Sequence, residues 1–316
     1  MKTLEPLYKE FRDLIELVLI PGMAIFLPWP LCFRLFRQLA RAPFLYARQT
    51  ALALEQAQKM DFVEDKQKWC AAFRLVQLVD HADLYLSRFR SDRWMERYLT
   101  VSGDSWPVPL TPFLAISFHW GAGLWSFRHL GRHGSRAVAV FGELGKSRVL
   151  GNIVATKYAY WRLGEVERAG RAKGIFTGPM VIRRMLQVSQ DGACLVALLD
   201  VPGADYCIPV QLFGRDARLP GGIVHFAVEK QIPVFAFTLS FDPDTGQRRL
   251  KITGSLACGN ERELMDGLVN VFTEAVGQQS YAWHFWPYLN DFLVAAEVKS
   301  AKYGSVETSD TTVQLE

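Results

Sequence analysis

The sequence predicts an α/β protein: a mainly parallel, mixed sheet flanked by helices, preceded by an N-terminal helical region. From Phe113 onward, short apolar runs of strand type alternate with helix-length segments, which is the pattern of parallel sheets with helices on both faces. Between Gln49 and Leu99 the chain contains no proline or glycine, and the first part is rich in alanine, leucine and glutamine, which favours helices. These two observations carry the prediction of fold class.

Composition limits the classes of function. The chain has 316 residues, of which 50% are hydrophobic and 13% aromatic, with nine tryptophans. This content of hydrophobic and aromatic residues is high for a freely soluble protein and suits one that lies on a membrane surface. The net charge is +4 without a long run of lysine or arginine, so nucleic-acid binding has little support, whereas a basic surface favours anionic lipid.

The five cysteines are scattered along the chain and form no C-x-x-C pair. Their number and spacing argue against a disulfide framework and against a zinc site, and they indicate a reducing compartment. The sequence therefore predicts no metal and no cofactor. The cysteines are Cys32, Cys70, Cys194, Cys207 and Cys258.

Residues 14–33 form an apolar segment, LIELVLIPGMAIFLPWPLCF, in which only Glu16 is charged. Its length approaches the ~20 residues that span a bilayer. Prolines at positions 21, 28 and 30 interrupt it, so a broken hairpin that dips into one leaflet fits as well as a full span. Acidic residues precede it and no small-residue cleavage site follows, so it is not expected to be a cleavable signal.

Four arginines follow this segment, and cations beside an apolar segment mark the cytoplasmic side of a membrane. Phe33, Phe36, Leu39 and Ala40 are spaced to share one helix face, with the arginines on the other. We therefore expect this region to associate with a membrane; the alternative is a buried hydrophobic hairpin in a soluble helical subdomain. The arginines are Arg34, Arg37, Arg41 and Arg48.

The chain is expected to divide into four parts. Residues 1–48 form the membrane-associating helices, and residues 49–104 form a helical region that ends at a turn over 102–104. Residues 105–297 form the α/β domain. Residues 298–316 are polar, with many serines and threonines, and are expected to be a disordered tail.

Within the α/β part, four apolar runs predict central strands, a fifth run predicts an edge strand, and helical patterns lie between them. The predicted central strands are 113–118, 137–141, 195–199 and 234–239, the edge strand is 248–253, and the helices are 149–161, 180–189 and 222–229.

The stretch FLAISFHWGAGL at 113–124 is the most informative. A strand-type run ends on His119, a glycine-containing segment follows, and a helical pattern then continues through Leu130. His119 is thus expected at the carboxyl end of a buried strand, where open α/β sheets build their sites. Imidazole is the usual general base near neutral pH. His119 is therefore a candidate base; the alternative is a histidine that caps a helix or fills a polar niche.

The remaining histidines lack the spacing of metal ligands and lie at apolar, loop or helical positions. We interpret all of them as structural. They are His81, His129, His133, His225 and His284.

Several further segments occur in the order found in one known family, over roughly residues 20–290. They are LPWPLCFRLFRQLAR at 27–41, ACLVALLD ending on Asp200, IPVQLFGR at 208–215, LPGG at 219–222, IPV at 232–234 and YAWHFW at 281–286. Together with the His119 turn, this order resembles the lysophospholipid acyltransferase superfamily, and most closely its bacterial lipid A acyltransferase branch. In that comparison, YAWHFW resembles a tryptophan-rich closing strand.

The resemblance implies a membrane-associated acyltransferase at the cytoplasmic face of a bacterial inner membrane. Its donor would be acyl carrier protein or acyl-CoA, and its acceptor a hydroxyl of a lipid or amphiphilic molecule. In the family, four residues separate the histidine from an Asp or Glu that orients the imidazole and stabilises the imidazolium. His119 matches the histidine, but Leu124 occupies the position of the acid.

Two other acids are candidates to replace the missing carboxylate. Glu143 follows the strand at 137–141, and Asp200 ends the strand at 195–199, so both are expected at the same carboxyl edge of the sheet as His119. Glu143 is alternatively a solvated loop charge, and Asp200 an acid that caps the loop after it. Asp200 alone falls on a position that the resemblance supports.

Five residues are candidates for substrate binding. Trp120 either lines an acyl channel or packs in the core. Gly121 permits close approach of the backbone, and the helix N-terminus after it is expected to stabilise an oxyanion. Phe213 and Gly214 lead to Arg215, which either meets a phosphate of the carrier or lipid, or forms a surface salt bridge.

Two rival functions remain open. The first is a catalytically degenerate family member that binds acyl chains or a carrier protein without transfer, which Leu124 favours. The second is an acyltransferase of a pigment pathway of the aryl polyene type, which the unusual sequence around His119 allows. A plain soluble hydrolase has less support, because the sequence contains no G-x-S-x-G elbow.

Overall fold

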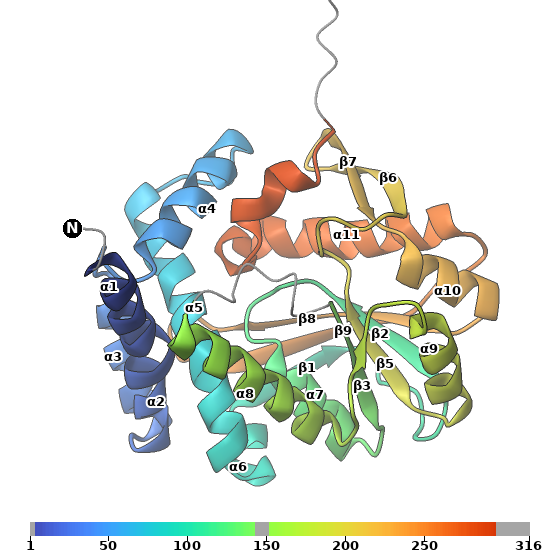
Figure 1. The fold of residues 1–316 in the computed structure, drawn as a ribbon, viewed down its shortest axis with the longest axis horizontal. Coiled ribbons are helices and arrows are strands. Elements are labelled where there is room, and N and C mark those ends of the chain that lie inside the picture. The colour runs from blue at the N-terminus through green and yellow to red at the C-terminus, as the bar shows by residue number, and fades with distance from the viewer. Residues whose placement is uncertain (1–3, 143–151, 295–316) are drawn as a thin grey trace, which may run out of the picture.

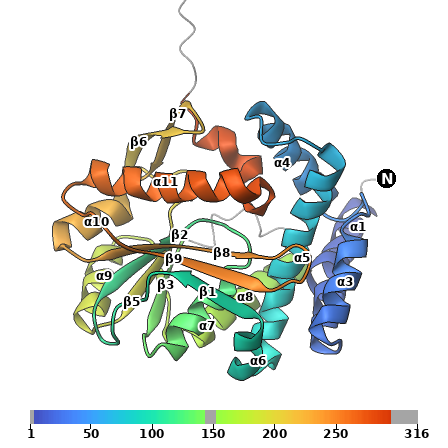
Figure 2. The ribbon, with the colours of Figure 1, turned by 180° about the vertical axis from the view of Figure 1, so that it is seen from behind.

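The structure is a computed structural model and describes residues 4–142 and 152–294. These residues form a seven-stranded sheet in the order β1-β9-β8-β2-β5-β3-β4, together with a separate hairpin, β6-β7. Helix α11 (Glu261–Gln279) covers one face of the sheet, and α7 (Leu124–Arg132) and α8 (Ile153–Gly170) lie on the other (Figures 1 and 2). The predicted α/β class, with a mostly parallel mixed sheet, is confirmed.

Four of the predicted strands form the centre of the sheet, at nearly the predicted bounds. Strand β2 lies between β5 and β8, parallel to both, and all five of its residues are buried. Burial on both faces explains why these strands read as continuous apolar runs rather than as alternating ones. The central strands are β2 (Phe113–Ser117), β3 (Ala137–Phe141), β5 (Cys194–Leu198) and β8 (Val234–Phe241).

The edge of the sheet differs from the prediction. Strand β9 (Arg248–Leu256) pairs antiparallel with β8 but is not the edge, because β1 (Leu99–Gly103) pairs with its other side. We expected residues 49–99 to be helical and 102–104 to be a turn. Four of the five residues of β1 are exposed, so no apolar pattern marks this strand, and its pairing with β9 decides its conformation.

Three further strands were not predicted. Strand β4 (Ile175–Phe176) is the opposite edge of the sheet, beside β3. Strands β6 (Cys207–Leu212) and β7 (Arg215–Pro220) form an antiparallel hairpin outside the main sheet.

The helices between the strands follow the predictions. The expected helices at 180–189 and 222–229 are α9 (Val181–Gln190) and α10 (Gly222–Lys230). The expected helix at 149–161 corresponds to α8, which begins at Ile153 and continues to Gly170; residues 149–151 lie outside the described ranges. Helix α11 was not predicted.

The N-terminal part is a series of helices. Among the described residues, no helix combines the length and the hydrophobicity that crossing a bilayer requires. Over residues 14–33, the chain forms a π-helix, a short α-helix, a 3-10 turn and the start of α3. The helices are α1 (Leu4–Asp13), η1 (Leu14–Leu19), α2 (Ile20–Gly22), η2 (Met23–Ile25), α3 (Trp29–Leu39), α4 (Ala47–Lys59), α5 (Lys66–Phe89) and α6 (Asp92–Arg97).

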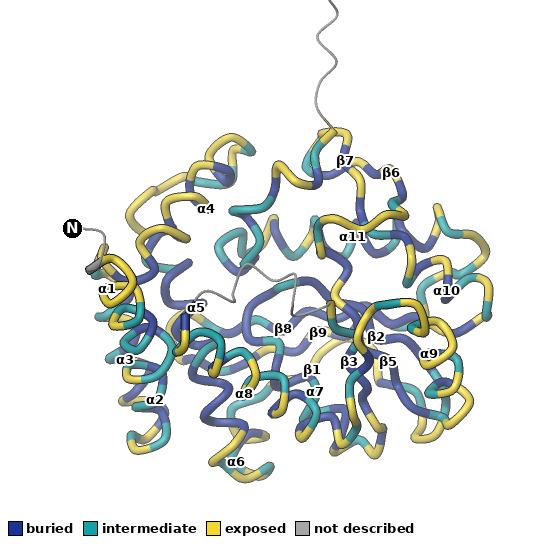
Figure 3. Tube along the Cα trace, viewed as in Figure 1, coloured by how far each residue is buried: buried dark blue, intermediate teal, exposed yellow. Residues whose placement is uncertain are grey.

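The predicted amphipathic face of α3 is confirmed. Phe33, Phe36 and Ala40 are buried, whereas all four arginines that follow the apolar segment are exposed. Helix α1 is mostly exposed (yellow in Figure 3).

A buried cation joins α3 to the sheet. Arg248 on β9 and Asp83 on α5 form an ion pair in which both side chains have 0% exposure. The guanidinium of Arg248 lies 3.9 Å from the ring centroid of Trp29 on α3 and 4.3 Å from that of Trp125 on α7. Trp29 also donates its indole N–H to the carbonyl of Gly246 at 3.1 Å. Helices α3, α5 and α7 thus enclose one charge from the sheet.

Candidate active site

The pairing of β2 with β5 brings His119 and Asp200 together. The two strands are parallel neighbours, and Ser117 pairs with Leu198. His119 and Asp200 each lie two residues further, at the carboxyl edge of the sheet. The Nδ1 of His119 is 3.0 Å from Oδ1 of Asp200, and the backbone N–H of His119 donates to both carboxylate oxygens at 2.9 Å.

The contact between these residues determines the state of the imidazole. Asp200 is 1% exposed, whereas the side chain of His119 is 29% exposed. An ionised carboxylate only accepts hydrogen bonds, so Nδ1 of His119 carries the proton and donates a hydrogen bond to Asp200. In the neutral ring, Nε2 then keeps its lone pair. This is the arrangement of a general base that a buried carboxylate orients.

Leu124 does not lie in a polar site. It is buried in an apolar cluster with Leu84 and Tyr85 of α5, Ala139 of β3 and Tyr158 of α8. The position that carries the acid in the resembling family is therefore part of the core here. The carboxylate at His119 comes instead from Asp200, one strand away.

The segment after α11 completes the surroundings of the pair. The indole N–H of Trp283 donates to Oδ2 of Asp200 at 2.7 Å, and the ring of Phe285 stacks on the imidazole of His119 with centroids 3.7 Å apart. We expected a closing strand at 281–286. The structure instead has 3-10 turns at Ser280–Ala282 and Trp286–Asp291, with a single bridge between Trp283 and Trp120.

Sequence reasoning did not identify Trp283 or Phe285 as site residues. They lie more than 80 residues beyond Asp200, and aromatic side chains in such a segment are usually core residues. The only signal was their place in the tryptophan-rich segment that resembles the family, because that segment closes the same edge of the sheet.

Gly121 occupies a position that only glycine fits. Its φ is +56°, and a Cβ there would lie 2.1 Å from the carbonyl oxygen of Leu239. Its N–H donates to the carbonyl of Ala282 at 2.9 Å, so this group is not free to bind an oxyanion. Trp120 is buried and packs edge-on against Phe272, as the core alternative predicts.

Phe213 and Gly214 form the two-residue turn of the β6-β7 hairpin. Both have positive φ, +52° and +76°, as a type I′ turn requires. Phe213 stacks on Trp286 at 5.6 Å and lies 6.1 Å from Trp283, which connects the hairpin to the aromatic residues beneath Asp200. Arg215 is exposed and forms no salt bridge within the described ranges.

Glu143 lies outside the described residues. Among the residues that are described, no group of three or more His, Cys, Asp or Glu side chains is placed to hold a metal ion.

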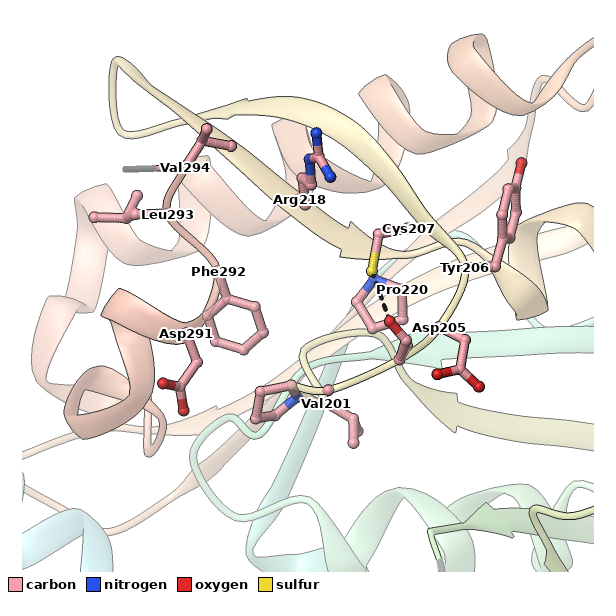
Figure 4. Close-up of a pocket in the computed structure, with 13 residues that line it drawn as sticks. Val201, Asp205, Tyr206, Cys207, Arg218, Pro220, Asp291, Phe292, Leu293 and Val294 are labelled. Atoms are coloured by element: carbon pink, nitrogen blue, oxygen red, sulfur yellow. Dashed lines mark hydrogen bonds between the residues drawn. The ribbon is translucent and has the colours of Figure 1, made fainter. Parts of the chain in front are cut away.

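A pocket of about 630 Å³ opens beside the loop that follows Asp200. Figure 4 shows its walls: the loop from Val201 to Cys207, the β7 residues Arg218 and Pro220, and the segment 291–294. His119 is not among the lining residues. Asp200 is not among them either, so the pocket is bounded by the loop that begins at Val201 and not by the His119–Asp200 pair.

The chain matches no protein-family model, and no curated protein sequence matches it at a significant level.

Proposed function

We propose that the protein is an acyltransferase that moves an acyl group from a thioester to a hydroxyl of a lipid or amphiphilic acceptor, with His119 as the general base. The observation that carries this proposal is the His119–Asp200 pair. Nδ1 of His119 is hydrogen-bonded to the buried carboxylate of Asp200, and the His119 side chain, which also carries Nε2, remains partly exposed.

The chemistry follows from these two groups. Nε2 of His119 accepts the proton of the acceptor hydroxyl while the oxygen attacks the thioester carbonyl carbon. The tetrahedral intermediate then collapses: the C–S bond breaks, and the departing thiolate takes the proton from the imidazolium. The products are an ester and a free thiol. Asp200 stabilises the imidazolium that exists between the two proton transfers.

The donor in this proposal is acyl carrier protein or acyl-CoA, and both carry phosphate. Arg215 is an exposed cation on a hairpin whose turn packs against Trp286 and Trp283. We assign it to a phosphate of the donor, with Phe213 and Gly214 as the turn that presents it. Trp120 and Gly121 shape the site from within, because both are held by backbone contacts to 282–283.

The protein is proposed to act at the cytoplasmic face of a bacterial inner membrane, attached to one leaflet without spanning it. Large apolar side chains are exposed on its N-terminal helices, and arginines lie beside them. Phe26, between η2 and α3, is 83% exposed. A surface of this composition binds bilayers that contain anionic lipid. The other exposed apolar residues of this region are Leu7, Tyr8, Phe11, Leu19, Leu31 and Phe44.

The test uses the full-length chain with labelled acyl carrier protein and acyl-CoA donors, and lipid, glycolipid and aryl-polyene-type acceptors. The wild type is expected to release free thiol and form ester, and His119→Ala is expected to lose ~10²–10⁴-fold in rate. If both proteins bind acyl carrier equally and neither turns over, the protein is a binding member of the family. Transfer only to the polyene acceptor would assign it to a pigment pathway.

A further inference from the structure

The segment 282–285 contacts His119, Gly121 and Asp200. It runs alongside His119–Gly121: the N–H of Gly121 donates to the carbonyl of Ala282, and the N–H of His284 donates to the carbonyl of His119, each at 2.9 Å. The two stretches are thus bonded at both ends of the turn that carries the base.

Trp283 restrains the carboxylate. Its indole is fully buried against Phe272 and Trp286, with ring centroids 5.1 and 4.9 Å away, so the direction of its N–H is fixed by packing. The N–H binds Oδ2 of Asp200, and Oδ1 faces Nδ1 of His119. Each carboxylate oxygen therefore has its own side-chain donor.

His284 restrains the backbone of the turn. Its Nε2 lies 2.8 Å from the carbonyl oxygen of Gly121, which only accepts, so Nε2 carries a proton. Its Nδ1 lies 2.8 Å from Nε2 of Gln77 on α5 and accepts from that amide. Burial lowers the pKa of His284, which keeps the ring neutral and in this one tautomer.

Phe285 restrains the imidazole itself. Its ring lies 9° from parallel to that of His119, with centroids 3.7 Å apart. One face of the imidazole is therefore covered, and the ring keeps the plane in which Nδ1 points at Asp200.

We infer that Trp283 and His284 are positioning residues of the site: Trp283 holds Asp200 so that Oδ1 accepts the hydrogen bond from Nδ1–H of His119, and His284, fixed by Gln77, holds the turn at His119 and Gly121. The geometry of the proposed base thus depends on three segments of the chain, those around His119, Asp200 and Trp283, and not on His119 and Asp200 alone. This inference deepens the proposed function and rests on it for its kinetic part, but its effect on the tautomer of His119 does not require catalysis.

The decisive variant is Trp283→Phe, which keeps a buried aromatic ring and removes only the donor to Asp200. Trp106→Phe is the matched control, because Trp106 is also a buried tryptophan but its indole N–H donates to Nδ1 of His129 at 3.0 Å, away from Asp200 and Trp283. The full-length proteins are labelled with ¹⁵N-histidine, and the spectrum of His119 is assigned by its loss in His119→Ala.

At a pH where the ring is neutral, His119 of the wild type and of Trp106→Phe is expected to carry its proton on Nδ1. Trp283→Phe is expected to shift a measurable share of the proton to Nε2 and to lower kcat about tenfold, with KM nearly unchanged. An unchanged tautomer and an unchanged kcat in a folded Trp283→Phe protein would overturn the inference.

The results also separate the inference from the proposed function. A shift of the tautomer in a protein that transfers no acyl group would retain the positioning role and reject the acyltransferase. If Trp283→Phe does not fold, Gln77→Met tests the second restraint: Nδ1 of His284 loses its donor, and kcat is expected to fall with KM nearly unchanged. An unchanged kcat together with an unchanged His119 tautomer in a folded Gln77→Met protein would then reject the inference.

Discussion

Asp200 meets His119 across 81 residues of sequence because two parallel neighbours, β2 and β5, end in register. The carboxylate that contacts His119 therefore comes from the end of the adjacent strand and not from the helix that follows the histidine. Rigid elements of the sheet hold both residues, which is a favourable place for a catalytic pair.

Asp200→Asn is expected to lower kcat by ~10²–10⁴-fold while the fold is kept. The amide group of asparagine donates to Nδ1 of His119 and leaves the proton on Nε2, so the base has no lone pair to offer. Rate measurements and circular dichroism check this, with the exposed Asp205→Asn as the control. The effects of two residues that act together are not additive. The double variant His119→Ala/Asp200→Asn is therefore expected to have nearly the same rate as His119→Ala. We expect Glu143→Gln to have a smaller effect than Asp200→Asn.

Leu124→Glu is expected to destabilise the protein and not to restore an acid to the site. The new carboxylate would replace a buried leucine in the cluster that includes Leu84, Tyr85 and Tyr158, and its desolvation is expected to cost roughly 3 kcal/mol. Urea unfolding monitored by tryptophan fluorescence gives the free energy of unfolding, and Leu124→Met is the volume-conserving control. A gain in acyl transfer with unchanged stability would show that this side chain reaches His119.

Phe26→Ser/Leu31→Ser is expected to weaken binding to anionic vesicles by about tenfold or more, because both side chains are exposed and supply apolar area to the bilayer. Co-sedimentation with vesicles measures the effect, and high salt should weaken the wild type further by screening the arginines. Val108→Ser/Leu110→Ser removes equally exposed side chains elsewhere and serves as the control. Equal binding by all three proteins at low salt would disprove attachment through this region.

The free energy of unfolding is expected to fall as the pH drops from about 6.5 to about 4. Burial lowers the pKa of His81 to about 4 in the folded state, whereas the pKa of this side chain is near 6.5 in the unfolded state. Between these two values the unfolded chain binds a proton at His81 and the folded chain does not, so acid favours unfolding. The contribution of His81 reaches about 3 kcal/mol. In His81→Gln the decline over this range should be shallower than in the wild type. Urea titrations at each pH measure the difference.

The sequence contained enough to place His119 and Asp200 at one edge of the sheet, because each ends an apolar run and parallel strands bring such ends together. It did not reveal which acid reaches the imidazole, since that depends on strand order: β5 is next to β2, whereas β3 lies beyond β5. The sequence also did not show that Leu124 faces the core. Nor did it show β1, because the exposed residues of this strand form no periodic apolar pattern.

Trp283, His284 and Phe285 were beyond sequence reasoning for another reason. Aromatic and histidine side chains serve a core as readily as a site, and only the tertiary contact with residues 119–121 distinguishes the two uses. From the sequence, we interpreted His284 as a structural residue. In the structure, its two ring nitrogens connect Gln77 of α5 to the carbonyl of Gly121, in the turn that follows His119.

The enclosure of Arg248 by Trp29 and Trp125 means that the N-terminal region cannot be treated as a removable anchor. Deleting residues 1–40 would take away one of the two rings around a fully buried cation and expose the faces that Phe33 and Phe36 cover. The shortened chain would fail by misfolding, and its loss from the membrane fraction would say nothing about lipid. The proposed membrane attachment and the folding of the chain involve opposite sides of the same helices, so only changes on the outward side can separate the two.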